Sequence, residues 1–180
     1  MNLQLIDVIL TDHLIIRRFI REDFSSVHEI LKDDSPLQRF MPFDPHTSKE
    51  ETQRVFDTVF SKENTYAIEY SGRCIGALFL LPEGEESVTI SHFIHSSFFG
   101  KGFILEAYEA AIYLAFEKMD VGKIFADVAD EDHHNIKLLK ALGMKLVSQK
   151  ENFTARGKTY GALSFSINKD DYFAFGGFKF

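Results

Sequence analysis

The sequence is poor in residues that would mark several classes of protein. It holds one cysteine, Cys74, in 180 residues, so an internal disulfide cannot form and nothing requires an oxidising compartment. It carries 20 Lys and Arg residues against 27 Asp and Glu residues, which gives a formal charge of −7. Because nucleic acids and anionic membranes attract a basic face, this balance argues against both as partners and leans weakly toward cationic ones.

Long apolar runs are also missing. No run approaches the roughly 18–20 residues that would span a bilayer. Asp7, Asp12 and His13 interrupt the start of the chain, where a signal peptide would be apolar. The segment DEDHHN at 130–135 lacks the ligand spacing of a metal site. We therefore predict a cytoplasmic protein that binds no metal and no membrane.

No repeat, low-complexity linker or change in composition divides the chain, so a single domain over residues 1–180 is the simplest assignment. The hydrophobic content of 45% is enough for a globular core. The tail at 171–180 is rich in phenylalanine, and we expect it to pack on this domain or on a second subunit of a homodimer.

Hydrophobic periodicity predicts alternating strands and helices. Helices are expected over 21–33, from the capping pattern of Ser48 with Glu51, over 103–119, and in a shorter segment that ends at Gly143. The expected strands occupy residues 13–20, 64–70, 73–81, 87–95, 123–129, 144–151 and 160–167. This pattern predicts an α+β fold whose strands run in mixed directions.

The turn between the strand at 87–95 and the helix at 103–119 holds two glycines, Gly100 and Gly102. Either the turn requires glycine for its geometry alone, or backbone amides are left bare to hold an anion. The first amides of a helix have no internal partner and lie in the positive potential of the helix dipole, to which Lys101 adds a charge. The pattern is neither a Walker loop nor the dinucleotide fingerprint G-x-G-x-x-G, since residue 105 is leucine.

Several separated motifs share their order with a known family. They are TDHLIIRRFIREDF from residue 11, GRCIGALFLL from residue 72, FFGKGFILEAYEAAIYLAFEKM from residue 98, KIFADV from residue 123 and NIKLLKALGM from residue 135. In these motifs the chain resembles the GNAT superfamily of acyl-CoA-dependent N-acyltransferases, and within it the branch of ribosomal-protein alanine N-acetyltransferases. The resemblance covers roughly residues 11–170 and implies a GNAT-like fold, with a mixed, mostly antiparallel central sheet flanked by helices.

The resemblance also implies where acetyl-CoA binds. The loop amides would hold its diphosphate, and the strand backbone before the loop would pair with its pantetheine arm and polarise the thioester carbonyl. The later helix would lie beside the sulfur and the adenosine, and the loop at 39–46 would wall the acceptor site. The implied cofactor-binding residues are Phe93, Ile94, His95, Phe99, Gly100, Lys101, Gly102, Phe103, Ile104, Asn135, Leu138 and Lys140. The residues assigned to the acceptor are Phe40, Met41, Phe43 and His92.

The chain departs from the family's usual residues at several positions. Ser97 stands where Gln or Arg commonly opens the loop motif. Asp132 and Asn135 stand where the family commonly has Asn and Ser or Ala. Leu139 stands where many members have the tyrosine that acts as general acid. The cofactor anchor is therefore kept, while the groups that handle protons are not the usual ones.

Acetyl transfer to an amine needs a proton acceptor, because an alkyl ammonium titrates near pH 10. Histidine titrates near neutrality, and of His92 and His95, which lie on opposite faces of a strand, one can face the substrate. We assign catalysis to His95 as the base and to Asn135 as a hydrogen-bonding partner of the thioester or the departing sulfur. The alternative is that each histidine only forms hydrogen bonds within the sandwich. Glu106 and Glu109 are expected to be solvated helix charges.

The leading hypothesis is an enzyme that transfers an acetyl group from acetyl-CoA to a primary amine, either a protein N-terminus or a small molecule. Transfer would be direct, in a ternary complex without a covalent intermediate. The rival hypothesis is a catalytically degenerate module that binds acyl-CoA or a protein partner. The missing tyrosine favours the rival, whereas the glycine loop suits both.

Overall fold

The computed structural model describes residues 8–119 and 121–179. In this part of the chain eight strands form one sheet in the order β1-β2-β3-β4-β5-β6-β8-β7. The strands are β1 (Val8–Leu10), β2 (Leu14–Arg17), β3 (Thr65–Tyr70), β4 (Arg73–Pro82), β5 (Ser87–Ile94), β6 (Lys123–Ala129), β7 (Lys145–Ala155) and β8 (Lys158–Asn168). Neighbours run antiparallel except β5 and β6, which run parallel. The predicted mixed, mostly antiparallel sheet is confirmed.

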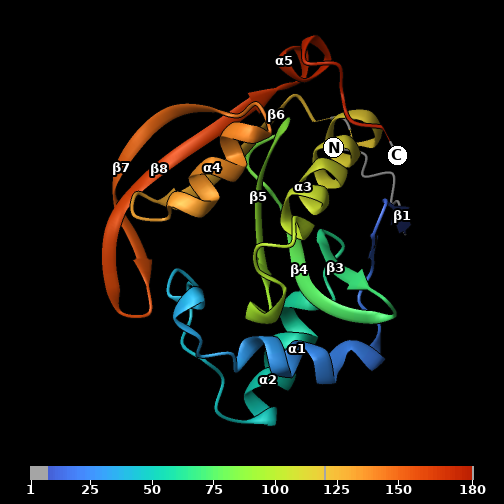
Figure 1. Cartoon of the computed structure of the whole chain (residues 1–180), viewed down its shortest axis with the longest axis vertical. Coiled ribbons are helices and arrows are strands. Elements are labelled where there is room, and N and C mark those ends of the chain that lie inside the picture. The colour runs from blue at the N-terminus through green and yellow to red at the C-terminus, as the bar shows by residue number, and fades with distance from the viewer. Residues whose placement is uncertain (1–7, 120, 180) are drawn as a thin grey trace.

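Helices cover both faces of the sheet (Figure 1). They are α1 (Phe24–Leu31), α2 (Lys49–Val55), α3 (Phe103–Tyr113), α4 (His133–Ala141) and α5 (Lys169–Ala174). Helices α2 and α3 continue as the π-helical turns η3 (Phe56–Phe60) and η5 (Leu114–Lys118), and the 3-10 turns are η1 (Arg21–Asp23), η2 (Pro36–Gln38) and η4 (Ser96–Phe98). The larger buried cluster joins α3 and α4 to one face of the sheet, and a second cluster joins α1 and η3 to the other.

Local sequence signals explain where two helices begin and end. The hydroxyl of Ser48 accepts a hydrogen bond from the Glu51 amide at the start of α2, as the capping pattern predicts. The Glu51 carboxylate, however, accepts from the amide of Thr47 rather than from that of Ser48. Gly143 follows the end of α4 with φ +77°, the left-handed conformation that favours glycine after a helix.

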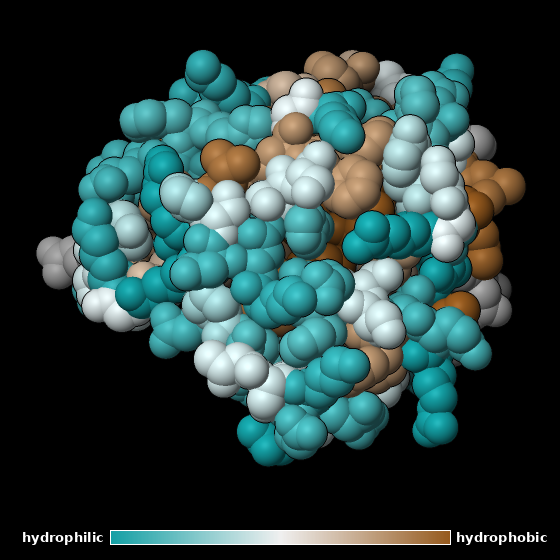
Figure 2. All heavy atoms as spheres, turned by 60° about the horizontal axis from the view of Figure 1, so that its bottom comes forward, coloured by the Kyte–Doolittle hydropathy of each residue, from teal (hydrophilic) through white to brown (hydrophobic). Residues whose placement is uncertain are grey.

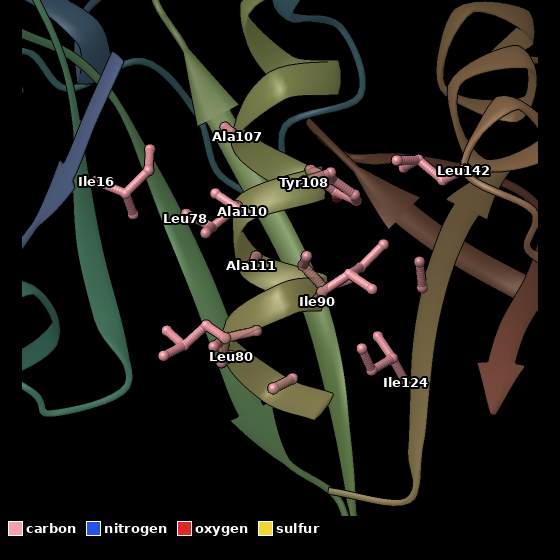
Figure 3. Packing of buried hydrophobic residues seen from close by; sticks show 14 of the residues in the cluster. Ile16, Leu78, Leu80, Ile90, Ala107, Tyr108, Ala110, Ala111, Ile124 and Leu142 are labelled. Carbon is pink, nitrogen blue, oxygen red and sulfur yellow. The ribbon is translucent and has the colours of Figure 1, made fainter. Parts of the chain in front are cut away.

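Helix α3 packs closely on the sheet because one side of it carries small residues (Figure 3). Ala107, Ala110 and Ala111 are fully buried against strand residues such as Leu78 and Ile90. Alanine side chains let a helix approach a sheet closely, because they occupy little space between the two. This contact fixes the start of α3, and with it the glycine loop, relative to β5.

The parallel pair β5 and β6 separates soon after it forms. The two strands pair at three positions, Ser87 with Lys123, Val88 with Ile124 and Thr89 with Phe125. Both strands then continue, and Figure 3 shows them diverging beyond Ile90 and Ile124. Their outer neighbours β4 and β8 stay paired with them throughout. The unpaired edges at 90–94 and 126–129 border what we call the strand gap.

The C-terminal segment lies against the α3 side of the domain. Tyr172 in α5 is fully buried beside Phe116, with ring centroids 5.1 Å apart, and its hydroxyl accepts from the amide of Phe178. Phe173 and Phe175 are exposed. In Figure 2, which brings the α1 and α2 end forward, hydrophilic side chains predominate and apolar ones show mainly in a central hollow and along one side. Every helix among the described residues is too short or too polar to span a bilayer.

Candidate functional site

The loop between β5 and α3 leaves a run of backbone amides without partners. Gly100 has φ +72° and Gly102 φ +82°, and no atom lies within 4 Å of where a Cβ would stand on either. In the described part of the chain, no hydrogen bond engages the amides of residues 100 to 104. The turn therefore needs glycine for its left-handed geometry, and the amides beside it remain open to a ligand.

One predicted loop residue does not share this property. The amide of Phe99 donates to the carbonyl of Ser96 at 3.1 Å and closes the 3-10 turn η4. Phe99 therefore cannot hold an anion through its amide, and this prediction needs correction. Its neighbour Lys101 is exposed, with its ammonium 5.1 Å from the ring of Phe98, so the predicted positive charge does stand at the loop.

Glu106 fixes the first turn of α3 to the far edge of the sheet. Its carboxylate accepts from the amides of His13 at 2.7 Å and Leu14 at 3.2 Å and from the hydroxyl of Thr11. Burial alone would raise the pKa of Glu106, but these hydrogen bonds outweigh it and lower the pKa below its usual value. The expectation that Glu106 is a solvated helix charge is therefore wrong, since only 17% of its side chain is exposed.

The strand gap exposes the backbone of β5 at alternate residues. His95 donates from its amide to Ile75 at 2.9 Å, so by the antiparallel alternation Phe93 pairs with Ala77, and the amides of His92 and Ile94 point away from β4 into the gap. The His95 carbonyl also accepts, from Phe98. Of the three strand residues predicted to bind pantetheine through their backbone, Ile94 alone has its amide on the gap. The backbone roles predicted for Phe93 and His95 are corrected on this ground.

Asn135, in the first turn of α4, presents an unpaired acceptor. Its amide group Nδ2 donates to Asp132 at 2.7 Å, which sets the orientation of the side chain, because a carboxylate cannot donate to Oδ1. Oδ1 is buried and has no hydrogen-bond partner in the described part of the chain. A buried carbonyl oxygen left unpaired costs free energy, so this atom suits an N–H group of a ligand.

Of the described α4 residues predicted to bind the cofactor, Leu138 and Lys140 have no unpaired buried polar atom like that of Asn135. Leu138 is partly buried and packs against the main core, while Lys140 is exposed. Leu139, at the position of the family's tyrosine, is 1% exposed and contributes to the core. The helix therefore offers no phenol at that position.

The two candidate histidines have different environments. The His95 ring accepts at Nδ1 from the amide of Ser97 at 3.2 Å, so in the neutral ring the proton lies on Nε2. The His92 ring lies 2.9 Å from the hydroxyl of Tyr108, measured from Nδ1. Burial lowers the pKa of His92 to about 4 and raises that of Tyr108. His92 is therefore neutral at pH 7.

The residues assigned to the acceptor do not meet at one place. Phe43 packs edge-on against Phe93, with ring centroids 6.0 Å apart, and Met41 joins the same cluster on the α1 face of the sheet. His92 alternates with Phe93 along β5 and contacts Tyr108 of α3, so it faces the opposite side. Phe40 lies farther along, 5.2 Å from the ring of Tyr160 in β8. The grouping of His92 with the loop residues is therefore corrected.

Sequence reasoning missed three polar residues at this site. Tyr108 lies on the apolar side of a predicted helix, which indicates burial but not the contact with His92. Gln38 is 3% exposed and donates from Nε2 to the carbonyl of Ile94 at 2.7 Å. Asp33 accepts from the amide of Ser96 at 2.8 Å. Among the described residues, no three or more His, Cys, Asp or Glu side chains are grouped to hold a metal ion.

Comparison with known proteins places the chain in a family. The family model of the acetyltransferase (GNAT) domain matches residues 13–145, more than half of the chain. The protein therefore belongs to the GNAT acetyltransferase family, which confirms the resemblance seen in its motifs.

Solved structures share this fold. A GNAT-family acetyltransferase from Bacillus anthracis superposes with a TM-score of 0.81 at 19% identity, covering 91% of this chain and 99% of that one. The spermidine N-acetyltransferase from Vibrio cholerae, solved with CoA and spermine, gives 0.77 at 20% identity, with 91% and 99% covered. The ribosomal-protein-S5-alanine acetyltransferase from Vibrio fischeri gives 0.76 at 18%, with 92% and 98% covered. At these identities the likeness shows the fold.

Proposed function

We propose that the protein transfers an acetyl group from acetyl-CoA to a primary amine. One observation carries the proposal: a loop of five bare amides lies at the end of a strand whose open edge faces an unpaired gap. An anion with an extended, amide-containing arm fits this combination, because the loop suits phosphate and the edge suits peptide-like groups. Membership of the family and the CoA bound to the Vibrio cholerae relative support it.

The residues present fit coenzyme A. The amides of residues 100 to 104 and the ammonium of Lys101 would hold the diphosphate. The amides of His92 and Ile94 and the bare Oδ1 of Asn135 would bind the pantetheine arm, the amides as donors and Oδ1 as an acceptor. The thioester supplies an activated acetyl group whose leaving thiol titrates near 8.5.

The backbone of β5 would supply the electrostatic part of catalysis. An amide fixed in a strand is already oriented, so stabilising the negative charge that develops on a carbonyl oxygen costs no reorganisation. His92 and Ile94 are the residues whose amides point into the gap. This role needs no particular side chain, which explains how a chain without the family's tyrosine keeps the rest of the site.

The amine must lose a proton before it attacks. His95 can take it only if its Nδ1 releases the Ser97 amide, because Nε2 of the neutral ring is already protonated. Asn135 can accept a hydrogen bond at Oδ1 but cannot protonate a thiolate. We therefore assign Asn135 to ligand binding, and keep His95 as the base with exchange of its Ser97 bond as part of that step.

A second candidate is a module that binds acyl-CoA without catalysis. The burial of Leu139 and the engaged Nδ1 of His95 favour it. Both candidates predict binding of coenzyme A, so binding alone does not separate them.

Thiol release from acetyl-CoA tests the proposal. The protein is incubated with acetyl-CoA and a panel that contains spermidine, amino acids and peptides with an N-terminal alanine, and free CoA is measured against a reaction without amine. We expect amine-dependent release with at least one acceptor. Binding of CoA by calorimetry without release from any acceptor would favour the binding module, and no CoA binding would exclude both.

A further inference from the structure

A buried glutamine joins the loop between α1 and α2 to the strand that faces the gap. Gln38, in η2, donates from Nε2 to the carbonyl of Ile94 at 2.7 Å and to Asp33 Oδ2 at 3.2 Å. The same Oδ2 accepts from the amide of Ser96 at 2.8 Å, and Oδ1 accepts from Ser35 at 3.0 Å. The carbonyl of Ile94 lies on the edge of β5 that faces away from β4, and Ser96 begins η4 two residues after β5 ends. The side chains of Gln38 and Asp33 thus satisfy the backbone hydrogen-bonding groups of Ile94 and Ser96 at the end of β5.

The same loop reaches the other side of the gap. Phe40 packs on Tyr160 of β8, and the guanidinium of Arg156, in the β7–β8 turn, donates to the Asp34 carboxylate at 2.9 Å and to the Asp33 carbonyl at 3.1 Å. The segment of residues 33 to 40 therefore contacts both the end of β5 and the β7–β8 hairpin. In Figure 1 this segment runs from α1 toward the lower end of β7 and β8.

We propose that Gln38 is a positioning residue that holds the α1–α2 loop over the strand gap and so places the acceptor amine relative to Ile94. This role rests on the proposed function. The carbonyl of Ile94 is closed by Gln38, while the amide of the same residue stays open to the gap. One residue thus links the loop that walls the acceptor to the edge that faces the thioester.

A neutral amide suits this position better than a charged side chain. The cluster already holds the carboxylates of Asp33 and Asp34 and the guanidinium of Arg156. Gln38 donates to an uncharged carbonyl and to a carboxylate at once, which an amide group does with its two N–H bonds. A carboxylate in its place would face Asp33 and the Ile94 carbonyl, which repel it.

Gln38→Met tests the role, because methionine keeps the length and loses both donors. We expect the KM for the acceptor to rise about tenfold, the effect of one lost hydrogen bond at a buried carbonyl. The Kd of CoA should stay within about twofold, since Ile94 keeps its amide. The matched control is Gln53→Met in α2, an exposed glutamine whose side chain bonds only Asp57 among the described residues. It should leave both constants unchanged.

Gln38→Glu gives a second readout that a merely structural residue would not produce. As a carboxylate it should raise the acceptor KM further than methionine does at pH 8. As a protonated acid it can again donate to the Ile94 carbonyl, so the ratio of its KM to that of wild type should fall as the pH is lowered toward 6. This test holds if Gln38→Met fails to fold.

The outcomes separate the role of Gln38 from the function itself. Wild-type protein that releases no CoA with any amine overturns the proposed function and this role with it. An active wild type with an unchanged acceptor KM in Gln38→Met, or a pH-independent KM ratio in Gln38→Glu, overturns the role alone. Tighter CoA binding by Gln38→Met would show that Gln38 competes with pantetheine for the Ile94 carbonyl, which also overturns it.

Discussion

The two halves of the site are built in opposite ways. The half proposed to bind the cofactor consists of backbone groups left unpaired, in the loop at 100–104 and along β5. The half proposed to place the acceptor consists of side chains that form hydrogen bonds within one network, such as Gln38, Asp33 and Arg156. Substitutions in the two halves should therefore differ in their effect on CoA affinity, which should fall in the backbone half and change little in the side-chain half.

The largest effect is expected in the loop. Gly102→Ala should weaken CoA binding on the order of a hundredfold, because a methyl group would enter the space proposed for the diphosphate and would strain the left-handed turn. Isothermal titration calorimetry measures this. Gly84→Ala is the matched control, since Gly84 has φ +79° in the β4–β5 turn. Both variants should lose about 1–2 kcal/mol of stability. Equal CoA affinity in the two would contradict the anchor.

Asp33 is expected to affect stability rather than CoA affinity. Burial alone would raise the pKa of Asp33, but the hydrogen bonds from Ser96, Ser35 and Gln38 lower it to about 2. Because the folded pKa lies below the unfolded value, the charged form stabilises the fold above about pH 4, and this contribution is lost as the pH falls toward 2. Asp33→Asn should therefore lose about 1–2 kcal/mol at pH 7, discounted for partial exposure, with CoA affinity little changed.

Urea denaturation at pH 7 and at pH 2.5 checks this prediction. The difference between Asp33→Asn and wild type should shrink at the lower pH. Asp34→Asn is the control, since its side chain is 79% exposed and a surface ion pair contributes about 0–1 kcal/mol. A difference for Asp33→Asn that is the same at both pH values would show that the charge is not what stabilises the network.

A smaller effect on CoA affinity than that at Gly102 is expected at Asn135. Asn135→Leu removes the bare Oδ1 and should weaken CoA binding about fivefold, as for one hydrogen bond to a ligand. Its stability should change little, because the lost bond to Asp132 is offset by removal of an unpaired buried acceptor. Calorimetry beside Asn152→Leu, an exposed site on β7, measures the difference. Unchanged affinity would remove Asn135 from the ligand site.

The half made of backbone could be predicted from the sequence. Gly100 and Gly102 mark a left-handed turn before a periodic helix, and Ser48 and Gly143 mark helix ends, because each of these signals lies within a few neighbouring residues. The strand limits that matter for the gap also followed from short apolar runs. What could not be predicted is which amides within those strands face outward, because that depends on register, and so Phe93 and His95 were misassigned.

The half made of side chains could not be predicted. Gln38 and Ile94 are 56 residues apart, and Arg156 and Asp33 are 123 apart. A glutamine in a proline-rich loop looks solvated in sequence, and nothing in its neighbours indicates that the chain folds back over it. The bond of Glu106 to the β1–β2 turn was missed for the same reason, since its helical position indicated a polar stripe.

The short pairing of β5 with β6 has a consequence for the whole molecule. Within the sheet, three residue pairs join β1–β5 to β6–β8, and the buried cluster around α3 packs against both parts. A ligand that formed hydrogen bonds to both β5 and β6 would connect the two parts of the sheet. The ligand-saturated protein should therefore unfold at a higher temperature and be cleaved more slowly by proteases than the ligand-free protein. Slower amide exchange at 90–94 and 126–129 after ligand addition would be the first sign of it.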